Sequence, residues 1–408
     1  MHNVYFPHVE SALMSSSDQS SAFEDGPASE LIRETARDIA DLYDDEYWQA
    51  VNHEQVEPTE FWQDCADAGF LGAAVPEEYG GEGMGIQEVT TIVQTFAENG
   101  CMGTGMLWVV TPVFGSITLS QNGTEEQKER YLPKLANGEM KFCMALTEPR
   151  AGHNTLNLDT FAEPTDDGFV VNGTKQWISG VDRADKMLLV ARTKPESEVE
   201  RRTDGITLFL ADPSDDAVEY HPLETGIPAP ETQYEIHFDN YHLDEDAVIG
   251  EQDNGLYQLF ETVNPERLVG AANAVGAGKC ALNRAIEYAN SREVFDAPIG
   301  SHQAVQHPIA DAWSKLEAAE LLVRKGAWTV DNGGEAGAAA NMAKLRATEA
   351  CYEACDVAVQ THGGNGLSPD YFVVDLWKAS RLGRIAPGSS QMMRNYIGER
   401  VLGLPRSY

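Results

Sequence analysis

Two polar segments near the middle of the chain have residue types that could bind a planar ligand. They are residues 145–149 (ALTEP) and residues 172–179 (NGTKQWIS). Each lies at the end of a short apolar run that predicts a β-strand. A buried heteroaromatic ring needs hydrogen-bond donors at its edge, and an aromatic side chain such as Trp177 can shield one face. The alternative is an ordinary sheet with a core tryptophan and a polar turn.

The two segments resemble the flavin-contacting signatures of the acyl-CoA dehydrogenase family. The resemblance implies FAD as the cofactor, with Thr147 at the pyrimidine edge of the ring. It also implies that Ser179 lies near the hydride-accepting nitrogen and Trp177 against one ring face. Further cofactor contacts implied by the same segments are Met144, Leu146 and Ile178.

Three later segments match the same family in the same order. Arg292 and Phe295, followed by His302 and Gln303, resemble the segment that reaches a neighbouring subunit's flavin pyrophosphate. A guanidinium suits that role because it can bond two phosphate oxygens at once. Because the family completes its flavin site across a subunit contact, the resemblance implies a homotetramer built as a dimer of dimers, or a dimer.

The other two segments resemble the parts of the family that contact the rest of the cofactor. Residues 360–366 (QTHGGNG) resemble the glycine turn on the adenosine half, where absent side chains allow close approach. Its cofactor contacts would be Gln360, Gly363 and Gly364, and those of the last turn would be Ser389 and Gln391.

The general base is the harder assignment. Many family members carry it in a Tyr-Glu-Gly-Thr segment, but residues 385–389 of this chain read IAPGS, with Pro387 in place of the carboxylate. The isovaleryl- and long-chain-type members take the base from the first long helix of the last domain, which implies Glu266 here, in the first helical turn after Pro265. Arg267 would steady the helix start or bind CoA. The alternative is that Glu266 only favours a helix N-terminus, an effect of about 0.3–1 kcal/mol.

Two departures from the family pattern bear on substrate binding. In the family, a ribityl hydroxyl and the backbone N–H at the position of Pro387 donate to the thioester oxygen. Proline has no N–H, so the resemblance implies that one donor is lost. Either the Gly388 N–H replaces it, the ribityl hydroxyl carries more of the effect, or catalysis is weak. Residues 151–154 read AGHN, where the family usually has a hydroxyl residue after the glycine. Gly152 and His153 would contact the pyrophosphate, and His153 also the substrate. Alternatively, His153 is a surface turn residue and the Gly152 backbone does the work.

The resemblance implies an acyl-CoA dehydrogenase of fatty acid β-oxidation that converts a saturated acyl-CoA to a trans-2-enoyl-CoA. Glu266 would remove the α proton, the β carbon would deliver a hydride to FAD, and an electron-transferring flavoprotein would accept the electrons. One alternative is a flavin oxidase or monooxygenase on the same fold. Another is a catalytically weak protein that binds acyl-CoA and FAD.

Hydrophobic periodicity predicts an α+β fold in three parts after an expected disordered extension over residues 1–26. Residues 27–140 have helical spacing, and Thr124 with Gln127 forms a capping-box pattern. Residues 141–250 contain short β-prone runs. Residues 251–408 predict long helices near 265–290, 303–331 and 335–361. This order resembles the family's all-α domain, central antiparallel β-barrel and C-terminal four-helix bundle.

The composition excludes some partners. The 408 residues include 29 basic and 65 acidic side chains, a net charge of −36, which disfavours binding to nucleic acid or anionic membranes. No apolar run of about eighteen residues predicts a membrane span. The six cysteines lack metal or disulfide spacing and indicate buried thiols in a reducing cytoplasm. The acidic excess suggests a halophilic protein, because high salt screens self-repulsion.

Overall fold

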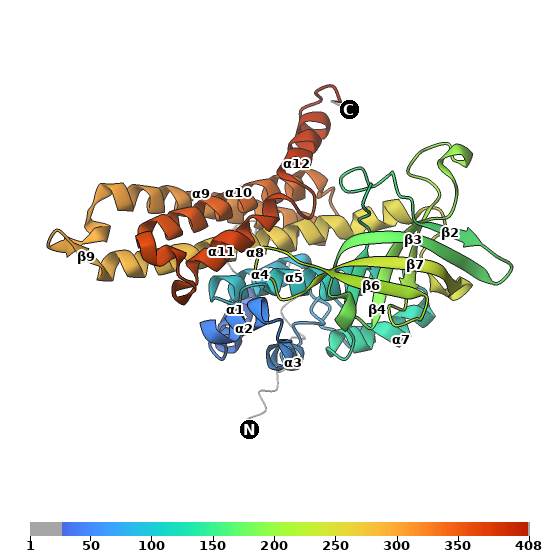
Figure 1. Ribbon diagram of the computed structural model, residues 1–408, viewed down its shortest axis with the longest axis horizontal. Coiled ribbons are helices and arrows are strands. Elements are labelled where there is room, and N and C mark those ends of the chain that lie inside the picture. The colour runs from blue at the N-terminus through green and yellow to red at the C-terminus, as the bar shows by residue number, and fades with distance from the viewer. Residues whose placement is uncertain (1–26, 407–408) are drawn as a thin grey trace.

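The computed structural model describes residues 27–406, so the extension expected over residues 1–26 lies outside the described residues. The molecule is elongated, with a β-sheet at one end, a bundle of long helices extending to the other, and the N-terminal helices packed beside both (Figure 1). The order of helices, sheet and helices is the one that the sequence pattern predicts.

The described residues of the N-terminal part, up to residue 140, form helices joined by loops and contain no strand. The core of this part is a set of edge-to-face aromatic rings that includes Trp48, Phe61 and Phe96. The predicted capping box is present: the Gln127 N–H donates to Thr124 Oγ1 over 3.2 Å, and the Thr124 N–H donates to Gln127 Oε1 over 3.1 Å. The elements are α1 (Pro27–Ala40), α2 (Asp45–His53), α3 (Thr59–Asp67), α4 (Ile86–Glu98), α5 (Thr104–Trp108), the π-helical η2 (Val109–Ile117), α6 (Thr118–Asn122) and α7 (Glu125–Ala136).

The middle part is one eight-stranded sheet with the order β6-β7-β3-β2-β4-β5-β8, and β1 pairs with β4. The sheet is mixed and not purely antiparallel as expected, because β1 and β2 both run parallel to β4. Parallel pairing needs a long connection, and the β2–β3 hairpin lies in the connection from β1 to β4. The strands are β1 (Phe142–Ala145), β2 (Phe161–Pro164), β3 (Gly168–Ser179), β4 (Lys186–Arg192), β5 (Ile206–Ala211), β6 (Val218–Leu223), β7 (Gln233–Asp244) and β8 (Val248–Ile249).

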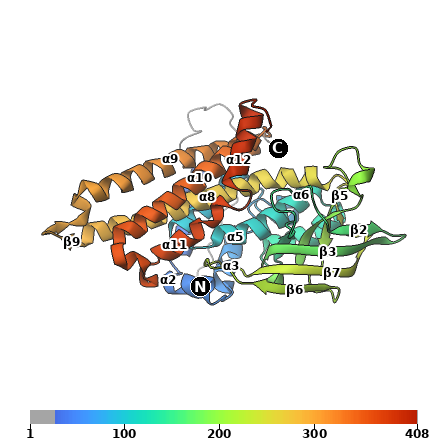
Figure 2. The ribbon, with the colours of Figure 1, turned by 45° about the horizontal axis from the view of Figure 1, so that its top comes forward.

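The C-terminal part is a bundle of α8 (Gly255–Ser291), α9 (Gln303–Asp331), α10 (Gly337–His362) and α11 (Val373–Ser380). A short hairpin, β9 (Glu293–Val294) and β10 (Ala297–Pro298), connects α8 to α9. The last helix, α12 (Ser390–Tyr396), projects away from the bundle (Figure 2). Gly276 lets α8 approach α4 closely, since a Cβ there would stand 2.3 Å from the Gln94 carbonyl oxygen.

The start of α8 was predicted wrongly. The helix begins at Gly255 and not near residue 265, so Pro265 lies inside it. A proline in a helix interior removes one backbone hydrogen bond and is normally unfavourable. Here Leu256 and Leu259 are buried in a core shared with the sheet, and this tertiary packing holds the preceding turns in helical form. Glu266 is therefore in the helix interior, and the macrodipole explanation for it no longer applies.

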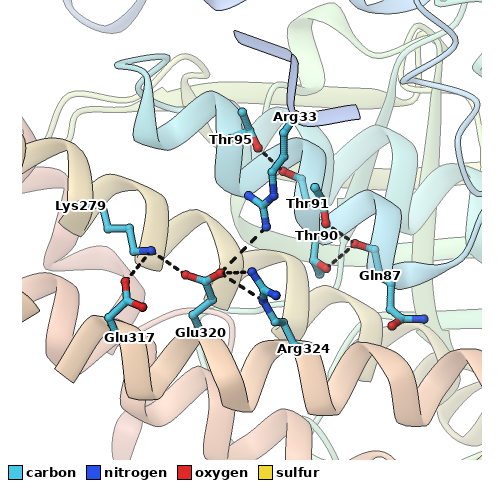
Figure 3. Close-up of polar contacts among 9 residues, drawn as sticks. All are labelled: Arg33, Gln87, Thr90, Thr91, Thr95, Lys279, Glu317, Glu320 and Arg324. Carbon is cyan, nitrogen blue, oxygen red and sulfur yellow. Dashed lines mark hydrogen bonds and ion pairs between the residues drawn. The ribbon is translucent and has the colours of Figure 1, made fainter. Parts of the chain in front are cut away.

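A buried ion cluster joins α8 and α9 with α1 (Figure 3). Glu320 accepts hydrogen bonds from Lys279 Nζ at 2.6 Å and Arg324 Nη2 at 2.7 Å, and Arg33 Nη2 is 3.9 Å away. Lys279 also pairs with Glu317 at 2.8 Å. Burial opposes ionisation of Glu320, but Lys279 and Arg324 outweigh it and lower the pKa of this carboxyl to about 2. Glu320 is thus a fully paired structural anion.

The six cysteines are buried free thiols, as the sequence pattern indicated. Residues 27–406 contain no cluster of three or more candidate metal-ligating side chains. None of the helices in this range combines the length and hydrophobicity that a bilayer crossing needs.

Candidate active site

Glu266 is a buried carboxyl group without a polar partner. It is only 6% exposed, and it makes no hydrogen bond or ion pair with any residue in the range 27–406. Burial raises the pKa of Glu266 to about 8, and the nearby charges of Arg267 and Lys344 oppose part of this rise. A buried carboxyl whose pKa lies near neutrality has the properties of a general base.

Two cations lie near Glu266. Arg267 donates from Nη1 to Asn264 Oδ1 over 3.2 Å, and its Nε has no hydrogen-bond partner. Of the two roles expected for Arg267, steadying the start of α8 is excluded, because that start is at Gly255; binding of CoA stays a prediction. Lys344 on α10 is 1% exposed and donates from Nζ to the carbonyl oxygen of Gly388. Sequence reasoning missed Lys344, because nothing near it in the chain marks it as functional.

The turn that contains Pro387 contacts one of these cations, because the Gly388 carbonyl oxygen accepts from Lys344. The Ala386 N–H donates to Leu382 O over 2.9 Å, and Pro387, which follows a cis peptide bond, has no N–H. The Ser389 N–H donates to His153 Nε2 over 3.1 Å. The Gly388 N–H has no acceptor among the described residues. It is the backbone donor that this turn leaves for a ligand.

His153 has a role that neither sequence interpretation anticipated. It is exposed in the turn after β1, but its ring accepts a hydrogen bond from the C-terminal turn. The adjacent Gly152 has open space where a Cβ would stand. The Ser389 side chain accepts from the Met392 N–H over 3.3 Å and so caps α12, while Gln391 is exposed on that helix.

The ends of β1 and β3 form the second part of the site. The Thr147 carbonyl accepts from the Gln176 N–H over 2.8 Å. A register shift in β3 between Gln176 and Ile178 places Trp177 at a backbone φ of +62° and leaves it 52% exposed. Ile178 is buried in the sheet core, where only its backbone could meet a ligand. Trp177 is therefore not the core tryptophan of the alternative interpretation, because the bulge turns it outward.

Polar groups hold these strand ends in place. The Ser179 hydroxyl accepts from Gln233 Nε2 over 2.9 Å. Lys175 Nζ lies 2.7 Å from Glu148 Oε1 and 3.0 Å from the Leu146 carbonyl oxygen, and Lys175 and Glu148 are both buried. Burial opposes ionisation of Glu148, but Lys175 and backbone donors keep the pKa of this carboxyl low. Both residues belong to the sequence motifs, yet their pairing is visible only in the structure.

The remaining candidate residues lie elsewhere in the chain. Phe295 is 89% exposed at the tip of the β9–β10 hairpin, at the opposite end of the molecule from β3 (Figure 1). Arg292, His302 and Gln303 flank the same hairpin, and all three are exposed. One chain therefore does not bring this segment to Trp177.

The residues of the site fit a large planar group with polar edges. Trp177 presents a half-exposed ring, and the Thr147 hydroxyl has no hydrogen-bond partner among residues 27–406. Gly363 and Gly364, in the exposed turn after Gln360, have no atom within 4 Å of a Cβ built on either residue. Met144 and Leu146 pack partly buried beside the sheet core.

Comparison with known proteins identifies the family. Models of the acyl-CoA dehydrogenase N-terminal, middle and C-terminal domains match residues 26–139, 143–241 and 253–402, in this order. The chain belongs to the acyl-CoA dehydrogenase family. Membership confirms the predicted fold class, FAD as the cofactor and an oxidoreductase activity.

Individual members of the family are similar over almost the whole chain. Acyl-CoA dehydrogenase FadE12 of Mycobacterium tuberculosis is 38% identical over 391 residues, which cover 95% of this chain and 99% of that protein. A 3-(aryl)acrylate reductase of Clostridium sporogenes is 32% identical over 380 residues, covering 91% and 98%. The solved structure of PigA with FAD and proline has a TM-score of 0.88 and 25% identity, covering 94% of this chain and 99% of its own.

Proposed function

We propose that this family member oxidises a saturated acyl-CoA to a trans-2-enoyl-CoA and that Glu266 is its catalytic base. The observation that carries the proposal is the isolation of Glu266, a buried carboxyl with no donor to satisfy it. Burying an unpaired carboxyl group destabilises the fold, and such groups are typical of functional sites. The 38% identity to a protein named acyl-CoA dehydrogenase supports the substrate class.

The chemistry follows from the surroundings of Glu266. Its ionised form takes the α proton of the thioester, and the raised pKa strengthens it as a base toward that weak carbon acid. Charge then develops on the thioester carbonyl oxygen, and the Gly388 N–H, which has no acceptor among the described residues, would donate to it. Bound FAD would supply the hydride acceptor for the β carbon. The side chains that would hold FAD include Thr147, Trp177 and Ser179.

The test is anaerobic reduction of the bound flavin by acyl-CoAs of graded chain length. The loss of the flavin's visible absorbance measures the reduction. Wild-type protein should bleach with at least one of them. Glu266→Gln should abolish bleaching at the same mixing time while leaving the oxidised flavin spectrum intact. Glu261→Gln removes an exposed carboxylate from the same helix and serves as the matched control. Bleaching by Glu266→Gln at the wild-type rate would contradict the assignment.

The proposal extends to the cellular context. An electron-transferring flavoprotein would accept the electrons, and β-oxidation in the cytoplasm would supply the acyl-CoA. Because the β9–β10 hairpin and β3 lie at opposite ends of one chain (Figure 1), a second copy would complete each flavin site in a dimer or dimer of dimers. Sedimentation of the FAD-loaded protein tests this. The net charge of −36 supports a halophilic protein, and higher thermal stability at about 2 M salt than at low salt is the expected result.

A second candidate is the reverse reaction, reduction of a 2-enoyl thioester. It is favoured by the 32% identity to a protein named 3-(aryl)acrylate reductase. The same Glu266 would then protonate the α carbon, which requires its acid form. Comparing the two directions distinguishes the candidates: recovery of flavin absorbance when reduced protein meets an enoyl-CoA, faster than bleaching of oxidised protein by the corresponding acyl-CoA, supports reduction. A flavin oxidase or monooxygenase would instead regain its absorbance rapidly in air, with no thioester present.

A further inference from the structure

The peptide bond between Gly388 and Ser389 is held at both of its polar ends. Its carbonyl oxygen accepts from Lys344 Nζ, and its N–H donates to His153 Nε2 over 3.1 Å. Lys344 comes from α10, whereas His153 comes from the turn after β1 and is 236 positions before Ser389. Two parts of the fold that are distant in sequence therefore meet on a single peptide plane.

Both departures from the family motifs occur at this contact. Pro387 removes one N–H from the turn, and His153 stands where a hydroxyl residue is usual. The histidine ring reaches the peptide that directly follows the Pro387–Gly388 bond. Because peptide units are planar and rigid, fixing the Gly388–Ser389 plane restricts the backbone of Gly388, whose φ of +71° is a conformation that glycine adopts readily.

Lys344 has a second connection, to the charges of the site. It is buried and forms no ion pair within the described chain, and the charged groups that act on it are Glu266 and Arg267. Its positive charge favours the ionised form of Glu266. The same side chain thus contacts the turn that carries the free donor and stabilises the proposed base.

We propose that His153 and Lys344 are positioning residues that clamp the Gly388–Ser389 peptide from opposite sides and so aim the Gly388 N–H at the thioester carbonyl oxygen. The proposal rests on the proposed function. It explains how a chain with proline in this turn retains a backbone donor for the developing negative charge. A donor aimed at charge that develops in the transition state affects the rate of reduction more than substrate affinity.

The experiment measures the rate constant of flavin reduction and the substrate Kd by stopped flow, at pH 9. Burial lowers the pKa of Lys344 to about 8, so at pH 9 little of its charge remains to be lost. His153→Phe keeps a ring but loses the acceptor, and Lys344→Met loses the donor. Each should lower the rate constant at saturating acyl-CoA by about 10- to 10²-fold, with Kd changed by less than about 3-fold. His153→Gln retains an acceptor and Lys344→Gln a donor, and both should recover most of the rate. His242→Phe, at an exposed position on β7, is the control.

The pH profile separates the two roles of Lys344. Loss of its charge raises the pKa of Glu266, so Lys344→Gln should need a higher pH to reach its maximal rate, while His153→Gln should keep the wild-type profile. An unchanged profile in Lys344→Gln would contradict the electrostatic part of the proposal.

Amide hydrogen exchange gives a readout that does not depend on turnover. The peptide fragment that contains Ser389 should exchange faster in His153→Phe and Lys344→Met than in wild type, and at the wild-type rate in His153→Gln. Wild-type exchange and reduction rates in both disrupting variants would overturn the clamp. If the exchange results hold but wild-type protein is not bleached by any acyl-CoA, the proposed function fails while the clamp itself stands.

Discussion

Glu266 and Glu320 are two buried glutamates on adjacent helices of the same bundle, and their surroundings affect them in opposite ways. Glu320 receives hydrogen bonds from Lys279 and Arg324, and its pKa falls to about 2. Glu266 has no hydrogen-bond donor in the described chain, and its pKa rises to about 8. Both are less than 10% exposed, so burial alone does not explain the difference.

The contrast shows that the partners of a buried carboxyl decide its use. Glu320 holds α8, α9 and α1 together because its charge is compensated inside the protein (Figure 3). Glu266 accepts no hydrogen bond from the described residues, and the charges of Arg267 and Lys344 act on it without direct pairing. A compensated carboxylate stabilises the fold, whereas an uncompensated one remains available to take a proton from a ligand.

The largest expected effect is on catalysis and separates the two glutamates completely. Glu266→Gln should lower the rate of flavin reduction by acyl-CoA by about 10²- to 10⁴-fold, because a positioned base contributes that much. Glu320→Gln should stay within about 3-fold of wild type, since Glu320 has no chemical role in the proposed reaction. Stopped-flow absorbance under anaerobic conditions measures both. A comparable loss in the two variants would remove the functional side of the comparison.

The second effect is on stability, where Glu320→Gln should have the larger effect and Glu266→Gln the smaller. Glu320→Gln should lower the free energy of unfolding by about 3 kcal/mol, because it removes the buried carboxylate that is paired with Lys279. Glu266→Gln should not lower it, since no polar contact is lost. Urea denaturation of FAD-loaded protein at pH 7 provides the measurement. A stability loss in Glu266→Gln as large as that in Glu320→Gln would mean that Glu266 is structural.

The third effect sharpens the comparison through pH. Between about pH 4.3, the pKa of an unfolded glutamate, and pH 8, folded Glu266 binds more protons than the unfolded chain. Its contribution therefore destabilises the fold as pH rises, by about 1.4 kcal/mol per pH unit. Folded Glu320 has a lowered pKa, so its stabilisation is present above about pH 4.3 and is lost as pH falls toward 2.

Urea titrations from pH 3 to pH 9 should show these slopes in different variants. Glu266→Gln should flatten the dependence between pH 5 and pH 8, and Glu320→Gln should flatten it below about pH 4.3. The same wild-type slope between pH 5 and pH 8 in Glu266→Gln would show that Glu266 ionises normally in the folded protein.

The smallest effect is expected at Glu317, which contacts the same Lys279 from the rim of the cluster. Its side chain is about half exposed, so solvent replaces much of the ion pair. Glu317→Gln should change the free energy of unfolding by less than about 0.5 kcal/mol. A loss near that of Glu320→Gln would show that the whole cluster acts as one unit.

The sequence predicted the features that depend on local spacing. Thr124 and Gln127 predicted the start of α7, and the two strand-end motifs indicated that Trp177 is available to a ligand. The helix start predicted from Pro265 was wrong, because the burial of Leu256 and Leu259 against the sheet overrides the local preference of proline for a helix start. Local sequence patterns depend on a residue and its neighbours in the chain, so they do not predict packing against an element that is distant in sequence.

The features that the sequence did not reveal are pairings across long separations. Lys344 meets Gly388 across 44 positions, and His153 meets Ser389 across 236. The residues of the Glu320 cluster come from three helices, and nothing in their local sequence distinguishes Glu320 from the many exposed acids. Such contacts form only after the bundle and sheet have docked.

All six cysteines are buried, and each of the three parts of the molecule contains at least one. Each part therefore has a thiol that becomes reactive only when that part opens. Cys65 and Cys101 lie in the N-terminal helices or the loop after them, Cys143 in the sheet, and Cys280, Cys351 and Cys355 in the bundle. A thiol-directed reagent that enters only transiently opened regions would label these sites in the order in which the parts loosen. Mass mapping of the adducts over time would then reveal which region opens first when the protein is heated or diluted.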